Sequence, residues 1–381
     1  MLKTNTQTIL NGWTETTLDD VAYINPVTAL IKGTSAKKVA MDNISPFTRK
    51  IASFTVSPFN GGMKFVNGDT LVARITPSLE NGKTSYVDFL TENEVAFGST
   101  EFIVLREKKE TSDSLFLYYL STSSIFRDIA IKSMTGTSGR QRVQTETIAN
   151  HKFILPQLKE QKAIAEVLSS FDDKIELLRE ENKTLEAMAQ ALFKNWFVDF
   201  EFPNKDGKPY KLSGGKMIDS ELGEIPDGWR VGNVGDYVEI RGGSTPSTKE
   251  SRYWDGDINW TTPKDLSAIK NDVFLFNTER KITDDGLEQI SSGLLQTDTL
   301  LMSSRAPVGY LAISKVPIAI NQGYIAFLPD AYFNNYFMYL WLQRNMDTVQ
   351  GVSGGSTFQE ISKSAFKTIQ CIVPAESILK N

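Results

Sequence analysis

Cysteine and histidine are almost absent from this chain of 381 residues, each type occurring once, as Cys371 and His151. A single cysteine cannot form an internal disulfide, which fits a reducing compartment. One Cys and one His also exclude a thiolate–imidazole zinc cluster. No run approaches the roughly 18 apolar residues of a membrane-spanning helix, and the first seven residues lack the pattern of a signal peptide. The sequence therefore predicts a cytoplasmic protein.

Familiar catalytic motifs are also missing. Gly82-Lys83-Thr84 resembles the end of a phosphate-binding loop, but Pro77 stands where that loop needs its first glycine. No Gly-x-Ser-x-Gly elbow accompanies His151, whose simpler interpretation is a surface or packing residue. Asn25-Pro26-Val27-Thr28 matches the Asn-Pro-Pro-aromatic motif of adenine methyltransferases only in part. We therefore expect no catalytic residues, no metal site and no bound cofactor, which favours a binding protein.

Positive charge is scarce for a protein that would bind nucleic acid. The chain has 41 Lys and Arg against 46 Asp and Glu, a net charge of −5, whereas nonspecific DNA affinity comes mainly from cations at phosphates. The deficit is uneven, because residues 1–155 carry 17 basic and 15 acidic side chains while residues 156–203 carry 6 and 10. The acidic surplus of the first half therefore lies in the middle segment.

The chain repeats itself, at a distance of about 216–218 residues at the two ends of the repeat. Five landmarks occur in the same order in both halves: residues 11–13 match 227–229, 18–21 match 234–238, 68–72 match 297–301, 136–139 match 351–354, and 154–156 match 372–374. Two copies of one domain are the simplest interpretation. Short β-rich runs and one helical run in each copy, residues 115–132 and 334–349, predict two similar mixed α+β domains.

A different kind of sequence separates the copies. Residues 158–200 contain no Gly or Pro and are rich in good helix formers. Apolar positions recur at alternating spacings of four and three, the heptad pattern of a helix that packs along another helix. A core helix wrapped by its own domain is the alternative. The heptad seam consists of Ile164, Leu168, Phe171, Ile175, Leu178, Asn182, Leu185, Ala189, Leu192 and Trp196.

The predicted organisation has five parts. Residues 1–156 form the first domain, 157–202 the long helix, 203–224 a linker, 225–374 the second domain, and 375–381 the start of a further helix. At 1.5 Å per residue the long helix is a rod of roughly 60 Å, which could set a distance between two domains.

Several loops combine cations with Gly, Ser, Thr and Gln. Such residues contact phosphate oxygens, and Arg, Gln and Asn can also pair with base edges. A solvated surface charge is the simpler interpretation of any one of them, and packing is that of Trp254 and Trp260. The DNA-binding candidates are Lys132, Arg140, Gln141, Arg142, Arg241, Lys249, Arg252, Lys264 and Arg305.

These motifs resemble the specificity subunits of type I restriction-modification systems. The helix segments at 158–168, 171–177 and 192–200 are similar to the central helix of that family, and Ile225-Pro226-Asp227-Gly228-Trp229 to the sequence that follows it. Residues 253–266, 303–309 and 321–324 look like landmarks of its target recognition domains. The match covers nearly the whole chain and is looser in the first domain.

The resemblance implies a function without catalysis by this chain. Two target recognition domains would each read half of a bipartite double-stranded DNA site, and the helix would set their spacing. Methyltransferase subunits would dock on the helical region and carry S-adenosylmethionine, while restriction subunits would use ATP and Mg²⁺. A coiled-coil adaptor without DNA recognition and a stand-alone DNA-modifying enzyme are the alternatives.

One departure from the family concerns a second helix, which usually follows the second domain and pairs with the first helix. The sequence ends near residues 375–381, where that helix would begin. We therefore expect the seam to be covered by a methyltransferase subunit or by self-association with a second copy.

Overall fold

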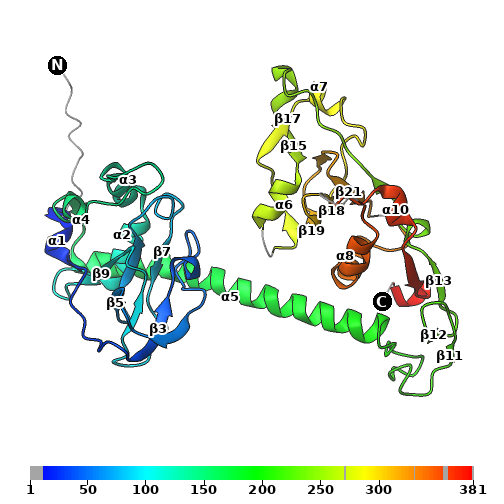
Figure 1. The fold of residues 1–381 in the computed structure, drawn as a ribbon, viewed down its shortest axis with the longest axis horizontal. Coiled ribbons are helices and arrows are strands. Elements are labelled where there is room, and N and C mark those ends of the chain that lie inside the picture. The colour runs from blue at the N-terminus through cyan, green and yellow to red at the C-terminus, as the bar shows by residue number, and fades with distance from the viewer. Residues whose placement is uncertain (1–11, 270–271, 330, 355–358, 380–381) are drawn as a thin grey trace. The chain divides into compact units, whose positions relative to one another are not determined.

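The protein is described by a computed structural model, which covers residues 12–269, 272–329, 331–354 and 359–379. The chain divides into two compact units, Met1–Glu181 and Asn182–Asn381, here named the first and second domains. Figure 1 shows both, and each is considered by itself.

The first domain is built from short strands, most of them in two four-stranded sheets of order β2-β9-β6-β7 and β4-β3-β8-β5, with a separate β1-β10 pair. Its helices α1, α3 and α4 gather at one end (Figure 1). The strands are β1 (Thr14–Thr17), β2 (Ala22–Ile24), β3 (Ser35–Val39), β4 (Thr55–Pro58), β5 (Met63–Phe65), β6 (Thr70–Ala73), β7 (Thr84–Tyr86), β8 (Ala96–Gly98), β9 (Phe102–Glu107) and β10 (Lys152–Leu155). The helices are α1 (Leu18–Val21), the 3-10 turn η1 (Met41–Asn43), α2 (Ser114–Thr122), α3 (Ser124–Lys132) and α4 (Thr145–Ala149).

The second domain has a five-stranded sheet of order β14-β21-β18-β19-β16, a three-stranded sheet β17-β15-β20, and the pairs β13-β22 and β11-β12. Its strands are β11 (Met217–Ile218), β12 (Ile225–Pro226), β13 (Arg230–Asn233), β14 (Ile240–Arg241), β15 (Trp254–Thr261), β16 (Phe274–Leu275), β17 (Arg280–Ile282), β18 (Leu300–Ser304), β19 (Val308–Ser314), β20 (Ala319–Ile320), β21 (Tyr324–Phe327) and β22 (Gln370–Val373). Its helices are η2 (Val234–Asp236), η3 (Ser251–Tyr253), α6 (Pro263–Ile269), α7 (Asp284–Leu287), α8 (Asn335–Arg344), α9 (Met346–Gly351), α10 (Lys363–Lys367) and α11 (Glu376–Leu379).

Helix α5 (Leu158–Phe197) is continuous over 40 residues. The absence of Gly and Pro explains its length, because both residues interrupt helices. Its first half belongs to the first domain and its second half to the second domain. The predicted fold class, two similar mixed domains joined by a long helix, is confirmed.

The two domains share one strand plan. In the first, β1 pairs antiparallel with β10, and β3 pairs parallel with β8. The second repeats both arrangements with β13 and β22, and with β15 and β20. The registers also match: Thr70 lies opposite Leu105 and Ile24 opposite Leu105, just as Leu300 and Ile240 both lie opposite Phe327. The internal repeat is therefore a structural repeat.

This register corrects two of the sequence correspondences. The matched Asp-Thr-Leu motifs place Thr70 beside Thr299, but the strand pairs make Thr70 equivalent to Leu300, one residue further on. Similarly, Thr135 corresponds to Gly354 and not to Gln350, because Thr135 and Gly354 occupy the bridges to Arg142 and Glu360. Similar letters at neighbouring positions explain both errors.

Each predicted long helix inside the domains is in fact two helices. The first is broken at Ser123, whose hydroxyl accepts a hydrogen bond from Phe126 N and so starts α3. The second is broken at Asn345 between α8 and α9. The packing interpretation of Trp254 and Trp260 is confirmed, since both are buried and their rings meet edge to face at 5.0 Å.

Candidate nucleic-acid interface

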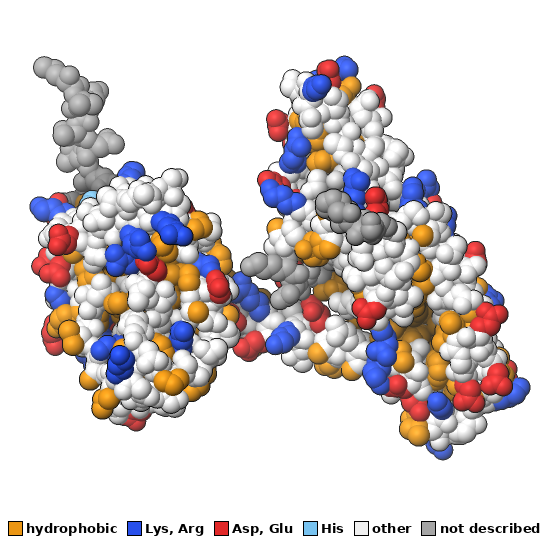
Figure 2. All heavy atoms as spheres, viewed as in Figure 1, with side chains coloured by type: hydrophobic (Ala, Val, Ile, Leu, Met, Phe, Trp, Pro, Cys, Tyr) orange, Lys and Arg blue, Asp and Glu red, His pale blue; other side chains and the backbone are white. Residues whose placement is uncertain are grey.

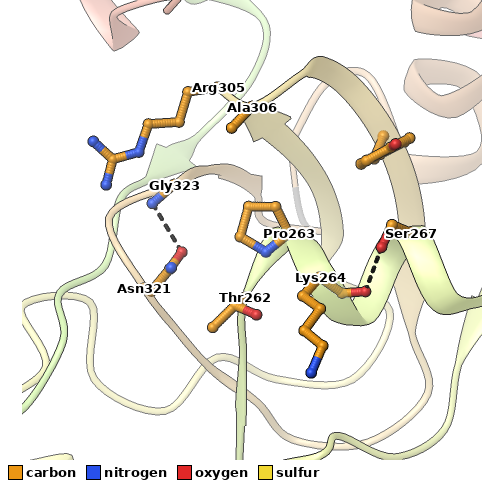
Figure 3. A pocket seen from close by; sticks show the side chains of 9 residues that line it. Thr262, Pro263, Lys264, Ser267, Arg305, Ala306, Asn321 and Gly323 are labelled. Atoms are coloured by element: carbon orange, nitrogen blue, oxygen red, sulfur yellow. Dashed lines mark hydrogen bonds between the residues drawn. The ribbon is translucent and has the colours of Figure 1, made fainter. Parts of the chain in front are cut away.

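Two loops of the second domain and the start of α6 meet around a pocket of about 460 Å³. They follow β15, β18 and β20, and Figure 3 shows their side chains around the ring of Pro263. The pocket is lined by Thr262, Pro263, Lys264, Ser267, Arg305, Ala306, Tyr310, Asn321 and Gly323. Two of the DNA-binding candidates, Lys264 and Arg305, thus lie beside one hollow although 41 positions separate them. We call residues 262–265, 304–307 and 321–323 the rim of the second domain.

Main-chain hydrogen bonds hold this rim in place. Asn321 N donates to Thr261 O at 3.2 Å, and Ser304 N donates to Gly323 O at 2.8 Å. The turn after β15 is fixed by a side chain, because Asp265 Oδ2 accepts from Thr262 N at 2.8 Å. The loops are therefore positioned mainly without using the side chains that face the pocket.

The two cations of this rim differ in how closely they are paired. The Arg305 guanidinium lies 3.7 Å from a Glu360 carboxylate oxygen, beyond hydrogen-bond length, and its side chain is 39% exposed. Lys264 Nζ is paired with Glu279 at 2.7 Å in an exposed contact. Asn321 Oδ1 accepts from Gly323 N at 2.8 Å (Figure 3). Among the described residues, no hydrogen bond engages the amide nitrogen of Asn321.

The first domain has an equivalent rim, residues 40–43, 74–77 and 99–101, which follow β3, β6 and β8. Its main-chain hydrogen bonds are the same: Ser99 N donates to Val39 O at 3.2 Å, and Arg74 N donates to Glu101 O at 2.9 Å. Asn43 Oδ1 accepts from Ala40 N at 2.7 Å, as Asp265 does in the second domain. The two rims thus share one backbone frame.

The side chains on that frame differ. In the first domain Arg142 donates to Glu101 through two nitrogens, with Nη2–Oε1 at 2.7 Å and Nε–Oε2 at 3.0 Å. Arg74 lies 3.9 Å from the same carboxylate. The hydrogen bond from Arg142 lowers the pKa of Glu101, while partial burial acts in the opposite direction. Arg142 is therefore fixed in a bidentate pair, whereas Arg305 is not.

The remaining candidates are exposed or half-exposed. In the first domain, Lys132 ends α3, Arg140 is exposed, and Gln141 anchors the rim through its backbone, which exchanges hydrogen bonds of 3.0 Å with Thr76. In the second domain, Arg241 pairs with Glu239 and Arg252 with Glu250 and Asp285, while Lys249 is exposed on the loop between β14 and η3. Lys264 and Arg305 share the pocket, and Arg142 and Gln141 adjoin the first rim.

Basic and acidic side chains are mixed over the visible face of each domain (Figure 2). Many of the candidate cations have an acidic partner, as the contacts above show. A single broad basic face is therefore absent from this view, and phosphate contacts would have to be local.

The predicted heptad seam of α5 forms an apolar stripe that the chain itself leaves exposed. Phe171 is 63% exposed and Leu185 61%, although large apolar side chains are usually covered. Ile164 at one end packs on the first domain, and Trp196 at the other packs in the second. The exposed members between them are Leu168, Phe171, Ile175, Leu178, Asn182, Leu185 and Leu192.

Polar contacts fix the first half of α5 to the first domain. The Arg49 guanidinium, on a side chain only 9% exposed, pairs with Asp173. Tyr119 Oη donates to Asp172 Oδ2 at 2.8 Å, and burial and then this bond raise the pKa of Tyr119. One turn into the helix, buried Gln161 donates to Pro156 O at 2.9 Å.

Aromatic packing holds the second half of α5 to the second domain. Phe193 is 5% exposed and lies 5.2 Å from the ring of Phe337. Phe197 meets Phe337 at 5.0 Å and Trp229 at 6.2 Å. Both phenylalanines of the helix pack on the core cluster that contains Phe337 and Trp341.

Sequence reasoning missed several residues of the two rims. Asn321 was singled out only as part of a landmark, and neither Arg74 nor Glu101 was singled out at all. Asn321, Gln322 and Gly323 interrupt the β-rich run of residues 318–327, and this interruption is the signal that could have located the loop.

The described part of the chain shows neither a metal-binding cluster nor a membrane-spanning helix. It contains no group of three His, Cys, Asp or Glu side chains placed to hold a metal ion. None of its helices is long and apolar enough to cross a membrane.

Comparison with known proteins supplies the family. A family model described as "Type I restriction modification DNA specificity domain" matches residues 11–187 and 226–378. The MjaIX specificity subunit of Methanocaldococcus jannaschii is 39% identical over 159 residues, 41% of this chain and 37% of that protein. The HindI specificity subunit of Haemophilus influenzae is 27% identical over 369 residues, 82% of this chain and 78% of that protein.

A solved structure shares the fold. The S subunit of a type I restriction-modification system from M. genitalium is 16% identical and aligns with 100% of this chain and 88% of its own, with a TM-score of 0.54. Together with the family match, the doubled domain and the long helix favour a specificity protein over a coiled-coil adaptor or a stand-alone DNA-modifying enzyme. The chain belongs to the family of type I restriction-modification DNA specificity proteins.

Proposed function

We propose that this chain is the DNA-reading subunit of a type I restriction-modification complex in the cytoplasm. Each domain contacts one half of a bipartite double-stranded target, and partner subunits carry out adenine methylation or cleavage. The chain itself supplies no catalytic group, and S-adenosylmethionine, ATP and Mg²⁺ are bound by the partners. The observation that carries the proposal is the repeated rim, because two copies of one surface suit a target made of two separate halves.

The chemistry of the rims suits DNA recognition. Arg and Asn side chains pair with guanine and adenine edges in the major groove, and backbone amides and Lys contact phosphates. The acidic neighbours of the cations keep nonspecific affinity low, since that affinity depends on unpaired positive charge at phosphates. The contacting residues are drawn from Lys132, Arg140, Gln141, Arg142, Arg241, Lys249, Arg252, Lys264 and Arg305.

The exposed stripe of α5 is the docking surface for partner chains in this proposal. Its methyltransferase subunit covers Phe171, Leu178 and Leu185, which removes an apolar surface from water at roughly 25 cal/mol per Å². Restriction subunits join through that complex. Self-association of two stripes is the alternative arrangement.

The function is tested with the chain copurified with the methyltransferase subunit of its complex. The complex is incubated with genomic DNA and S-adenosylmethionine, and methylated adenines are mapped. Methylation at one bipartite sequence, with two fixed halves and a constant gap, is the expected result. Methylation scattered without regard to sequence would overturn the proposal.

The docking surface is tested separately with Leu185→Asp, which places a charge in the stripe. Copurification of the methyltransferase subunit should fall at least tenfold, whereas Leu212→Asp, at a leucine 81% exposed outside the helix, should not change it. Light scattering on the isolated chain separates the two arrangements. A dimer that Leu185→Asp dissociates, together with unchanged capture of the methyltransferase, would favour self-association.

A further inference from the structure

Resting on the proposed DNA-reading function, we propose that the rim is the base-reading edge of each domain. The two rims carry different side chains at a few positions. These differences make the two halves of the target differ in base sequence. In the second domain the readers are Arg305 and Asn321, and they recognise purines, guanine through Arg305 and adenine through Asn321.

The two backbone frames are equivalent residue by residue. Arg74 and Ser304 donate their backbone N–H groups to Glu101 and Gly323, at 2.9 and 2.8 Å. The same Arg74 and Ser304 accept through their carbonyls, from Val143 N at 2.8 Å and Ile361 N at 3.0 Å. The isolated bridges between residues 75 and 142, and between 305 and 360, agree with this alignment.

The side chains at equivalent positions of this shared frame differ. Ile75 is replaced by Arg305, Ser99 by Asn321 and Glu101 by Gly323. Charge is reversed at two further positions, where Asp42 corresponds to Lys264 and Arg142 to Glu360. By contrast, the side-chain oxygen that fixes the turn is kept, from the amide of Asn43 in one rim and from the carboxylate of Asp265 in the other. Residues that hold the loops are similar, and residues that face outward differ, as two readers of different sequences require.

The side chains of the second rim have the hydrogen-bonding groups that pair with purines. The Arg305 guanidinium lies 3.7 Å from Glu360, and it donates no hydrogen bond to any described residue, so it can form two parallel hydrogen bonds with guanine O6 and N7. Asn321 keeps its amide nitrogen for adenine N7, and its oxygen, which already accepts from Gly323 N, has a second lone pair for adenine N6–H. Gly323 has no side chain at the position where Glu101 carries a carboxylate in the first rim.

The first rim recognises different bases because its arginine is already bound within the protein. Arg142 is bound through two nitrogens to Glu101, so its bidentate face is occupied within the protein. The carboxylate of Glu101 retains lone pairs that can accept from cytosine N4–H₂, and Ser99 can donate or accept. The two halves of the target are therefore unlike, and the site is not a palindrome.

The experiment uses the complex with the methyltransferase subunit and a library of DNA targets randomised at one position at a time. Arg305→Ala and Asn321→Ala should each reduce discrimination at one base pair by about 5- to 150-fold, the equivalent of one lost bidentate contact. Both positions should lie in the same half-site. The other half-site should keep its full preference, and Glu101→Gln should show the reverse distribution.

Controls separate folding from reading. Arg344→Ala removes an exposed arginine of the second domain outside the rim and should leave the sequence preference unchanged. Asn321→Ser installs the residue of the first rim, which the shared frame accommodates, so a loss of melting temperature is not expected. If all of these variants keep the preference of the wild type, the inference is overturned while the proposed function stands. If the wild-type complex itself shows no preference, the proposed function fails first.

Discussion

Apart from the apolar packing of Ile164 on the first domain, the two domains hold the same helix by different kinds of contact. The first domain uses an ion pair from buried Arg49 and a phenol hydrogen bond from Tyr119, whereas the second uses tilted rings around Phe193 and Phe337. Polar contacts depend on direction and on solvent, but aromatic packing depends mainly on the area removed from water. One shared fold can therefore hold a helix by either kind of contact. The two kinds should differ in their contribution to the free energy of unfolding and in its dependence on salt and pH.

The largest effect is expected for Phe193→Ala in the second domain. Removal of a buried ring costs about 3–5 kcal/mol of unfolding free energy, because the surrounding rings relax only in part. Leu192→Ala, at the neighbouring residue that is 52% exposed, should change the same quantity by less than about 0.5 kcal/mol. Denaturant unfolding followed by tryptophan fluorescence measures this, since five of the six tryptophans lie beyond residue 190. Equal losses of unfolding free energy for both variants would contradict a stabilising role for the aromatic contacts of Phe193.

A smaller effect is expected for Arg49→Ala in the first domain. A hydrogen bond between charged groups contributes about 1.5–3 kcal/mol, and the value should lie near the lower end because Asp173 is 64% exposed and regains water. A double-mutant cycle with Asp173→Asn gives the coupling, and amide exchange in the first half of α5 should accelerate. Lys32→Ala, at an exposed lysine, is the matched control. High salt should weaken this coupling and leave the effect of Phe193→Ala unchanged.

Tyr119→Phe sharpens the same side of the comparison. It keeps the ring and removes only the hydroxyl that donates to Asp172, so a loss of about 1 kcal/mol is expected. Tyr23→Phe, at a tyrosine 54% exposed, should be neutral. Urea unfolding followed by circular dichroism suits both. A neutral Tyr119→Phe would leave Arg49 as the main polar contact.

The smallest effect concerns pH at the rims. Because the pKa of Glu101 is lowered from its ordinary value of 4.5, its ion pair stabilises the first domain above that value. The contribution is lost as pH falls through the folded pKa. Glu101→Gln should therefore flatten the acid side of the stability profile of the first domain. The second rim has Gly323 at this position, so Gly323 supplies no corresponding titration there, and a flattening in the second domain would contradict the assignment.

Local patterns predicted the architecture well. The repeat, the single long helix and the two mixed domains follow from landmarks, from the missing Gly and Pro, and from heptad spacing. Contacts across the chain were not predictable in this way, because Arg49 and Asp173 are 124 positions apart and nothing local marks them as partners. The break at Ser123 depends on one capping hydroxyl, and the true register of Thr70 depends on strand pairing. Asn321 was noticed for its motif and not for its position beside Arg305.

The division of labour within the rims has a consequence for how such a protein changes. Its loops are tied down mainly by main-chain atoms, which every amino acid supplies, together with one side-chain oxygen from Asn43 or Asp265. Substitution of an outward-facing residue therefore leaves the scaffold intact, and a lineage can acquire a new target by a handful of replacements. The contacts that stabilise the fold are thus separate from the residues that determine the target sequence, so the target can change while the fold is kept.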